Sequence, residues 1–381
     1  MRIGVDLTSA VTQGGGIGRY TRELIHAVTQ LDLENEYRFF SAKQPLKLPV
    51  PNSIPQGNRI RYRQSPLEDK WHYRIWYRLR IPIPVQLLTG QIDLFHSPDF
   101  VLPPVLPKVP TLLTVHDLSF LHYPNTFPDS LVAYLNQVVP WSIKRATHIL
   151  ADSEATKRDL ESLWQISPEK ITVLLSGVTS SFSIVDEPTQ IERVKAKYGL
   201  GNAPYLLSVG TIQPRKNFQF LIRAFKPIAD RFPHNLIFSG GKGWMYDEML
   251  AEVEKQNLRE RVRFIGFVDD VDLPALYSGA SLFVFPSLYE GFGLPLLEAM
   301  ACGVPVLSSD ASSLPEVGQN TAVYCSPHDL NGWTENMNDL LGDQDRLQHL
   351  SQKGKAHVAQ FTWQKTAVQL LNIYEKIKES T

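Results

Sequence analysis

The sequence predicts an α/β protein made of two doubly wound domains, each built on a parallel sheet. The chain has 381 residues, which is long for one domain and comfortable for two. In both halves, short apolar runs that suit buried strands alternate with amphipathic stretches that suit helices. Strands separated by helices imply parallel sheets with right-handed crossovers. A small, polar stretch at 177–188 is interpreted as the linker between the halves.

Composition excludes several classes of protein. The net charge is −1, so no global charge indicates nucleic-acid binding. Cys302 and Cys325 give neither a disulfide framework nor a metal-binding spacing, and they suit a reducing compartment. The sequence begins directly with a strand, shows no signal-peptide region and has no apolar run long enough to span a bilayer. We therefore expect a cytoplasmic protein, and attachment to the inner membrane surface stays open.

The first half opens with a strand at 2–7, a glycine-rich loop at 13–18 and a helix with an apolar stripe. This order is typical of a phosphate cradle. It falls short of the dinucleotide pattern G-x-G-x-x-G, because Thr21 follows where a third glycine is needed. The second strand, at 37–40, ends in Ser41 and not in the acidic residue that would bind a ribose. NAD binding is therefore disfavoured.

A basic and aromatic segment lies at 70–80. Read as a helix, it places Arg74 and Arg78 on one side. Trp71, Ile75 and Leu79 lie on another side. Such a helix either docks on an anionic membrane or packs on its own domain with the arginines reaching water, and both interpretations stay open.

Two more predicted strands, at 93–98 and 111–117, end in polar residues. Ligands collect at the carboxyl ends of strands in open α/β sheets, so His116 and Asp117 are candidate site residues. Two further strands complete this half: 148–153 and 171–175.

The second half repeats the rhythm of strand and helix. Its predicted strands are 205–209, 235–239, 262–267, 281–285 and 304–307. Its predicted helices are 217–231, 246–256, 273–278 and 295–302. A last amphipathic stretch at 363–377 predicts a long helix.

The stretch 287–300 is the strongest candidate for a binding site. Its two glycines free the backbone to bend and let a ligand come close, and Pro295 suits the first turn of a helix. Backbone N–H groups at the positive end of that helix dipole form an anion site. The residues that supply them are Gly291, Phe292, Gly293 and Leu294.

Two carboxylates, Glu290 and Glu298, flank this anion site. They would repel an anion, so they make sense if the ligand carries hydroxyl groups on both sides of its phosphate. A nucleotide sugar is such a ligand, with ribose on one side and a hexose on the other.

Two adjacent cations, Arg215 and Lys216, follow the strand at 205–209 and are well placed for a diphosphate. The glycine-rich run 240–243 lacks the spacing of a phosphate loop and is interpreted as a turn. The run 269–272 contains D-x-D, a metal-binding pattern. We expect Asp269 or Asp270 to cap the helix that starts near Leu273 instead. No metal is needed, because two cations and two helix N-termini can stabilise a leaving diphosphate.

The spacing of Glu290 and Glu298 resembles the E-x7-E motif of retaining glycosyltransferases of family 4, which have the GT-B fold. The similarity covers most of the chain. It implies two facing Rossmann-like domains with a deep interdomain cleft: an acceptor-binding domain at 1–185 and a nucleotide-sugar-binding domain at 186–360. It also implies that the C-terminal helix, within 361–381, crosses back onto the first domain.

The resemblance implies roles for the motifs of the first domain and for the two adjacent cations of the second domain. Gly15 and Gly16 face the donor diphosphate and the acceptor, and His116 lies beside the donor sugar. Lys216 matches the lysine of the family. The family's arginine corresponds to Thr211 here, so Arg215 is expected to supply the second charge.

The two glutamates bind hydroxyl groups in this scheme: Glu298 those of the ribose and Glu290 those of the transferred sugar. His116 and Glu290 are the catalytic candidates, and the other residues bind the donor.

We therefore expect a retaining, metal-independent hexosyltransferase with no cofactor beyond its nucleotide-sugar substrate. Its partner is a glycan or lipid-linked acceptor, with no nucleic acid. The chain is similar to bacterial mannosyltransferases that use GDP-mannose. UDP-sugar transferases share these motifs and non-catalytic nucleotide-sugar-binding proteins share the fold, so both alternatives stay open.

Overall fold

The computed structural model describes residues 1–43 and 54–379, and these form two compact units. The first unit comprises Met1–Leu118, Ser130–Gly177 and Phe361–Thr381, and the second comprises Ser119–Asp129 and Val178–Gln360. Two parallel-sheet domains were predicted, but the boundary between 185 and 186 lies too late. Phe182 packs edge-on against Tyr277, and the Val185 N–H donates to the Ser278 hydroxyl, so residues 178–185 pack with the second unit.

The described part of the first unit contains a seven-stranded sheet in the order β3-β2-β1-β4-β5-β6-β7, in which each pair is parallel. Its strands are β1 (Arg2–Asp6), β2 (Glu36–Lys43), β3 (Ile60–Glu68), β4 (Leu94–Ser97), β5 (Thr111–Val115), β6 (His148–Ala151) and β7 (Ile171–Val173). β3 was missed because it is an edge strand with mostly exposed, charged side chains and no apolar alternation. The strand order reverses between β1 and β4, which makes this the topological switch point.

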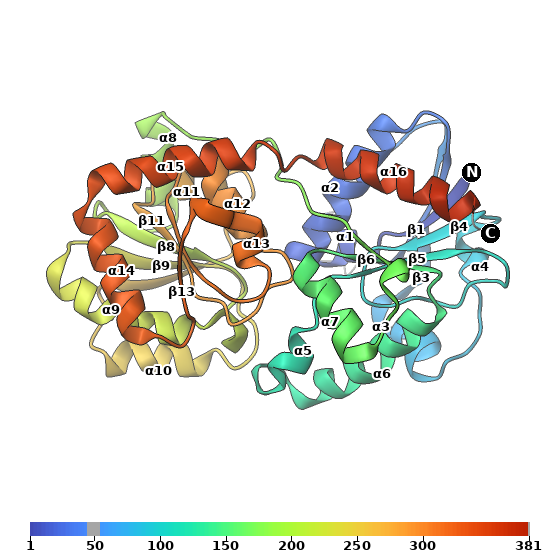
Figure 1. The fold of residues 1–381 in the computed structure, drawn as a ribbon, viewed down its shortest axis with the longest axis horizontal. Coiled ribbons are helices and arrows are strands. Elements are labelled where there is room, and N and C mark those ends of the chain that lie inside the picture. The colour runs from blue at the N-terminus through green and yellow to red at the C-terminus, as the bar shows by residue number, and fades with distance from the viewer. Residues whose placement is uncertain (44–53, 380–381) are drawn as a thin grey trace. The chain divides into compact units, whose positions relative to one another are not determined.

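Helices cover both faces of this sheet (Figure 1). They are α1 (Thr8–Thr12), α2 (Gly16–Leu31), α3 (Asp69–His72), α4 (Gln86–Thr89), α6 (Asp129–Arg145), α7 (Glu154–Trp164) and α16 (Trp363–Glu379). α16 belongs to the first unit and lies beside α2, and its Ala367, Leu370 and Tyr374 share one core with β1 (Figure 1). No helix in the described ranges has both the length and the apolarity that crossing a membrane requires.

The segment 70–80 differs from the predicted helix. After α3 it forms a π-helix at Tyr73–Arg78, with the Leu79 N–H donating to the Arg74 carbonyl. This changes the buried side, because His72 and Trp76 stack on each other and are buried. Trp71 is 43% exposed and Leu79 is 65% exposed. Two of the three residues on the expected apolar side are thus exposed, and the third, Ile75, is half-buried.

The second unit contains a six-stranded sheet in the order β10-β9-β8-β11-β12-β13, also parallel. Its strands are β8 (Tyr205–Val209), β9 (Asn235–Ser239), β10 (Val262–Gly266), β11 (Leu282–Phe285), β12 (Val306–Ser309) and β13 (Val323–Cys325). Here the order reverses between β8 and β11. All predicted strands of this half are confirmed, and β13 was not identified because it has only three residues.

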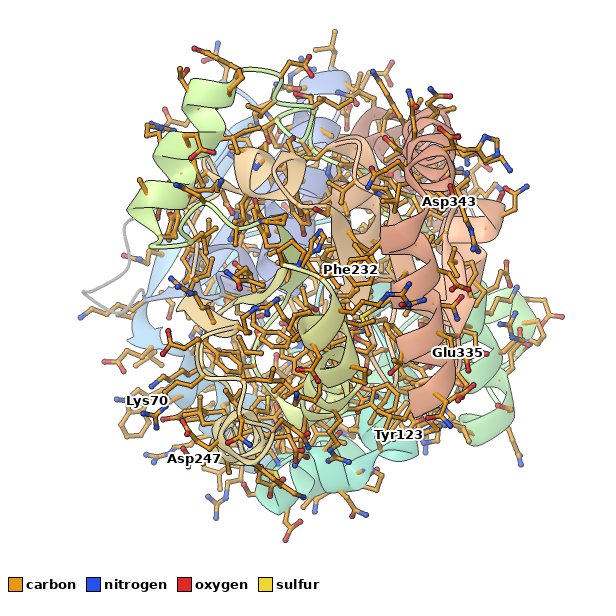
Figure 2. The ribbon with its side chains drawn as sticks, turned by 90° about the vertical axis from the view of Figure 1, so that its left-hand side faces the viewer. Lys70, Tyr123, Phe232, Asp247, Glu335 and Asp343 are labelled. Carbon is orange, nitrogen blue, oxygen red and sulfur yellow. The ribbon has the colours of Figure 1, made fainter. Side chains whose placement is uncertain are left out.

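The helices of the second unit include the four that were predicted. The α-helices of this unit are α5 (Ser119–His122), α8 (Pro188–Lys197), α9 (Phe218–Arg231), α10 (Asp247–Lys255), α11 (Leu273–Ser278), α12 (Leu294–Ala301), α13 (Leu314–Gly318), α14 (Leu330–Gly342) and α15 (Gln344–Val358). Those that were predicted are α9, α10, α11 and α12. Asp343 caps α15 through its side chain at the turn from α14, on which Glu335 is exposed (Figure 2).

The predicted cap at 269–272 is wrong. The residue at the start of α11 is Asp272, and its side chain makes no capping bond. It is buried and pairs instead with Lys197 and Arg193 of α8. Asp272, the second aspartate of the D-x-D pattern, therefore ties α8 and α11 together by ion pairs.

Candidate active site

The switch point of the second unit gathers the two strongest motifs of the sequence. β8 and β11 are neighbours in the sheet, so the loops at their carboxyl ends start side by side. The loop after β8 carries Arg215 and Lys216, and the loop after β11 carries Glu290. The Leu288 N–H donates to the Arg215 carbonyl, which joins the two loops directly.

Glu290 lies between the two predicted cations. Lys216 Nζ is 2.6 Å from one carboxylate oxygen, and Arg215 Nη1 is 3.2 Å from the other. Burial alone raises the pKa of Glu290, but the charges of Lys216 and Arg215 outweigh it and lower the pKa to about 2. Glu290 is therefore ionised at neutral pH and has no proton to donate. Separate roles for these residues were expected, yet here both cations bind Glu290.

The local backbone aims Lys216 inward. A short 3-10 helix spans Pro214–Lys216, and Asn217 follows in the left-handed conformation with φ 58°. The Asn217 amide donates to the Pro286 carbonyl, which holds the turn against the end of β11. The methylene chain of Lys216 lies against Gly210, at a place that a side chain on that glycine would fill.

The glycine loop 291–293 is shaped by close packing. Gly293 has φ 104°, and a Cβ on it would come within 2.6 Å of a Leu314 methyl group. α12 begins at once after it, and no side chain caps the helix. This agrees with the predicted strand, glycine loop and helix N-terminus, which is the geometry of an anion site.

A serine-rich segment after β12 holds the same loop, and no sequence pattern indicated this. The Ser312 hydroxyl accepts from the Glu290 N–H and donates to the Glu290 carbonyl. Ser313 donates to the carbonyls of Glu290 and Phe292. These bonds fix the backbone on both sides of the glutamate.

Glu298 lies one turn into α12 and is 3% exposed. The Tyr277 hydroxyl of α11 donates to its carboxylate at 3.0 Å. Its position on the helix that follows the glycine loop 291–293 matches the predicted order. Its buried partner Tyr277 was not identified from the sequence.

The segment Ser119–Asp129, which follows His116 in the chain, is part of the second unit. His122 of α5 stacks on Tyr289 with ring centroids 5.0 Å apart. Phe127 contacts Trp244, whose indole N–H donates to the Thr126 carbonyl. Tyr289, which precedes Glu290 in the chain, is thus covered by the ring of His122.

In the first unit, His116 follows β5 and is buried. Its Nδ1 is 2.8 Å from Asp152, and its Nε2 is 3.2 Å from the Pro98 carbonyl. Burial lowers the pKa of His116, but the charge and hydrogen bond of Asp152 prevail and raise the pKa to about 9. Asp152 was not singled out from the sequence, although it follows β6 at the same edge of the sheet.

Gly15 and Gly16 lie at the start of α2, where Gly15 is the N-terminal cap. A Cβ on either would meet open space. The glycine that the packing requires is Gly18, because a Cβ there would come within 2.0 Å of the Gln13 carbonyl oxygen.

The predicted residues thus form two groups, one in each unit. Those gathered in the second unit are Arg215, Lys216, Glu290, Gly291, Phe292, Gly293, Leu294 and Glu298. Those in the first unit are His116, Gly15 and Gly16. Over the described ranges, no group of three His, Cys, Asp or Glu side chains is arranged to hold a metal ion.

Comparisons with known proteins identify a glycosyltransferase family model in each half of the chain. A model of "Glycosyltransferase Family 4" matches residues 14–182, and a model of "Glycosyl transferases group 1" matches residues 190–357. O-antigen chain mannosyltransferase B of Escherichia coli is 34% identical over 375 residues, which cover 94% of this chain and 96% of that protein.

Solved structures share the whole fold. Sucrose-phosphate synthase from Thermosynechococcus elongatus superposes with a TM-score of 0.78 at 21% identity, covering all of both chains. Anabaena Alr3699/HepE, solved in complex with UDP and glucose, superposes with a TM-score of 0.73 at 17% identity, covering 99% of this chain and 100% of that one. Two Rossmann-like domains, motifs at the switch points and a relative matched along 96% of its length lead to one conclusion: the chain is a glycosyltransferase of family 4 with the GT-B fold.

Proposed function

We propose that this glycosyltransferase moves mannose from GDP-mannose to a glycan or lipid-linked acceptor in polysaccharide synthesis, with retention of anomeric configuration and without a metal ion. The mannosyl assignment is supported by the similarity to O-antigen chain mannosyltransferase B over nearly the whole chain. The observation that carries the donor assignment is the buried group of Arg215, Lys216 and Glu290 at the switch point of the second unit.

In this proposal the second unit binds the donor. The diphosphate lies at the N-terminus of α12 and beside the ammonium group of Lys216, which also binds Glu290. Glu290 accepts from hydroxyls of the mannose and Glu298 from those of the ribose. The first unit binds the acceptor near Gly15, Gly16 and His116.

The transfer step breaks the bond between the anomeric carbon and the diphosphate oxygen. The acceptor oxygen forms the new bond on the same face, and its proton passes to the departing phosphate. Lys216 and the N–H groups of α12 stabilise the charge that develops on that phosphate. No protein nucleophile takes part, and Glu290 acts as an acceptor of sugar hydroxyls.

A second donor remains a candidate, because the structurally similar HepE was solved with UDP-glucose. Thermal unfolding of the purified protein with GDP, UDP, ADP and NAD separates the two donors. A ligand at a hundred times its Kd adds about 2.7 kcal/mol to the stability of the protein. We expect a shift with GDP alone; a shift with UDP alone would replace mannose from GDP-mannose by a UDP-linked sugar.

Transfer itself is tested with GDP-mannose and a mannose-containing acceptor. Lys216→Met keeps the methylene chain against Gly210 and removes the charge, so we expect loss of transfer in a protein that folds but is less stable, because Arg215 is then the one cation of the pair left beside Glu290. Lys255→Ala, on the exposed side of α10, is the matched control and retains activity. Binding of GDP without any transfer would instead identify a non-catalytic nucleotide-sugar-binding protein.

The proposal includes a peripheral contact with membrane through residues 70–80. Trp71 and Leu79 are exposed there, and Arg74 lies over the Trp71 ring at 5.0 Å. Exposed aromatic and basic side chains together suit an anionic lipid surface. The protein should sediment with vesicles that contain phosphatidylglycerol, and less so after Trp71→Ser; equal binding to neutral vesicles would contradict this contact.

A further inference from the structure

Both ring nitrogens of His116 face groups that accept hydrogen bonds. Nδ1 lies 2.8 Å from Asp152 Oδ2, and Nε2 lies 3.2 Å from the carbonyl oxygen of Pro98. A backbone carbonyl can only accept, so Nε2 carries a hydrogen. Burial raises the pKa of Asp152, although the charge and hydrogen bond of His116 oppose this; as a carboxylate, Asp152 accepts from Nδ1. A histidine with hydrogens on both nitrogens is an imidazolium.

The charged and titratable groups around the ring agree with one cation at this place. Asp152 follows β6, Asp99 follows β4, and Tyr20 of α2 meets the ring edge-on at 4.9 Å. Asp117, next in the chain, acts on Asp152. His96 of β4 is the second histidine nearby, and burial together with the charge of His116 lowers its pKa to about 3, so it is neutral.

Asp152 has no other described partner that explains its burial. It is 6% exposed, and its Oδ1 accepts from no side chain or backbone group within the described ranges. Its neighbour Ser153 caps α7, and Thr156 of that helix donates to the His116 carbonyl. The backbone of His116 is thus fixed by α7, and its ring is fixed by Asp152.

We propose that Asp152 is a positioning residue that holds His116 as a fixed imidazolium, so that His116 acts on the transfer reaction through its charge and neither takes nor gives a proton. The kinetic part of this inference rests on the proposed transferase function, whereas the ionisation state of the ring does not. The expected consequence is a pH dependence: the positive charge of His116 persists through neutral pH and is lost as the pH rises through about 9.

The first arm of the test is nitrogen NMR of the full-length protein labelled at histidine. We expect both His116 nitrogens to resonate as imidazolium at pH 8, with His96 as a neutral reference in the same sample. In Asp152→Asn the carboxylate charge is gone, so the pKa of His116 should fall toward its ordinary value near 6.5 and the ring should become neutral at pH 8. A neutral His116 ring in the unmodified protein would overturn the proposal.

The second arm is the pH dependence of kcat/KM. With a pKa near 6.5 the imidazolium is only about 3% populated at pH 8, so Asp152→Asn should lose about thirtyfold in kcat/KM there and recover at pH 6. Asp152→Glu keeps the charge and should restore part of the loss. Asp93→Asn removes an exposed carboxylate that pairs with Arg2 and is the control, with an unchanged profile.

The two measurements distinguish failure of the proposed transferase function from failure of the proposed role of His116. If no sugar transfer is detected with any donor, the proposed function fails and the NMR result still decides the state of the ring. If Asp152→Asn neutralises His116 but the pH profile does not move, the role through charge is refuted.

Discussion

The buried carboxylate of Glu290 allows a quantitative test of the ion group at the second unit's switch point. Its pKa is about 2 in the folded protein against an ordinary value of 4.5. The difference corresponds to about 3 kcal/mol of folding free energy at pH 7. Because the folded pKa is the lower one, this contribution is complete above about pH 4.5 and is lost as the pH falls toward 2.

The perturbation is Glu290→Gln, which keeps the shape and removes the charge. We expect the second unit to lose about 3 kcal/mol at pH 7 and about half as much at pH 3. Hydrogen exchange of the β11 amides, read by mass spectrometry, measures this unit by itself, since a chain of two units need not unfold in one step. Glu335→Gln, on the exposed side of α14, is the matched control (Figure 2).

The control should change stability by less than about 0.5 kcal/mol. A loss in Glu290→Gln that is equal at pH 7 and pH 3 would refute the reasoning, because only an ionisation-linked term depends on pH in this window. A loss below about 1 kcal/mol at pH 7 would show that Lys216 and Arg215 do not compensate for the burial of the carboxylate.

Three further substitutions test the packing around the sites. Gly293→Ala meets Leu314 and a left-handed backbone, so it should lower Tm, at a cost of about 1–3 kcal/mol. Gly177→Ala would push a methyl group into the backbone at the start of α16, with a similar cost, whereas Gly241→Ala enters open space and should leave Tm unchanged. Ser312→Ala removes two hydrogen bonds to the loop 287–293 and should cost about 1–2 kcal/mol, seen as faster hydrogen exchange in that loop.

Local patterns were sufficient for most of the fold. The predicted strands and helices of the second unit lie within two residues of those observed, because apolar runs, glycines and Pro295 act over short stretches of chain. The misses have physical causes. β3 at the sheet edge exposes most of its side chains, so it lacks the apolar period of a buried element. The π-helix at Tyr73–Arg78 departs from the 3.6-residue period on which the prediction relied, so the buried side chains are His72 and Trp76 and not those expected.

The sequence by itself determined the class of protein and the candidate residues: two units of alternating strands and helices, a glycine loop at a helix start, and polar residues at strand ends. Only the tertiary structure decided the partners. Glu290 binds Lys216 across 74 positions, and His116 binds Asp152 across 36. These pairs meet because parallel strands bring their carboxyl ends to one edge in an order that local periodicity does not encode. The ionisation of Glu290 and of His116 follows from those partners and from burial, and both arise only when the sheets are assembled.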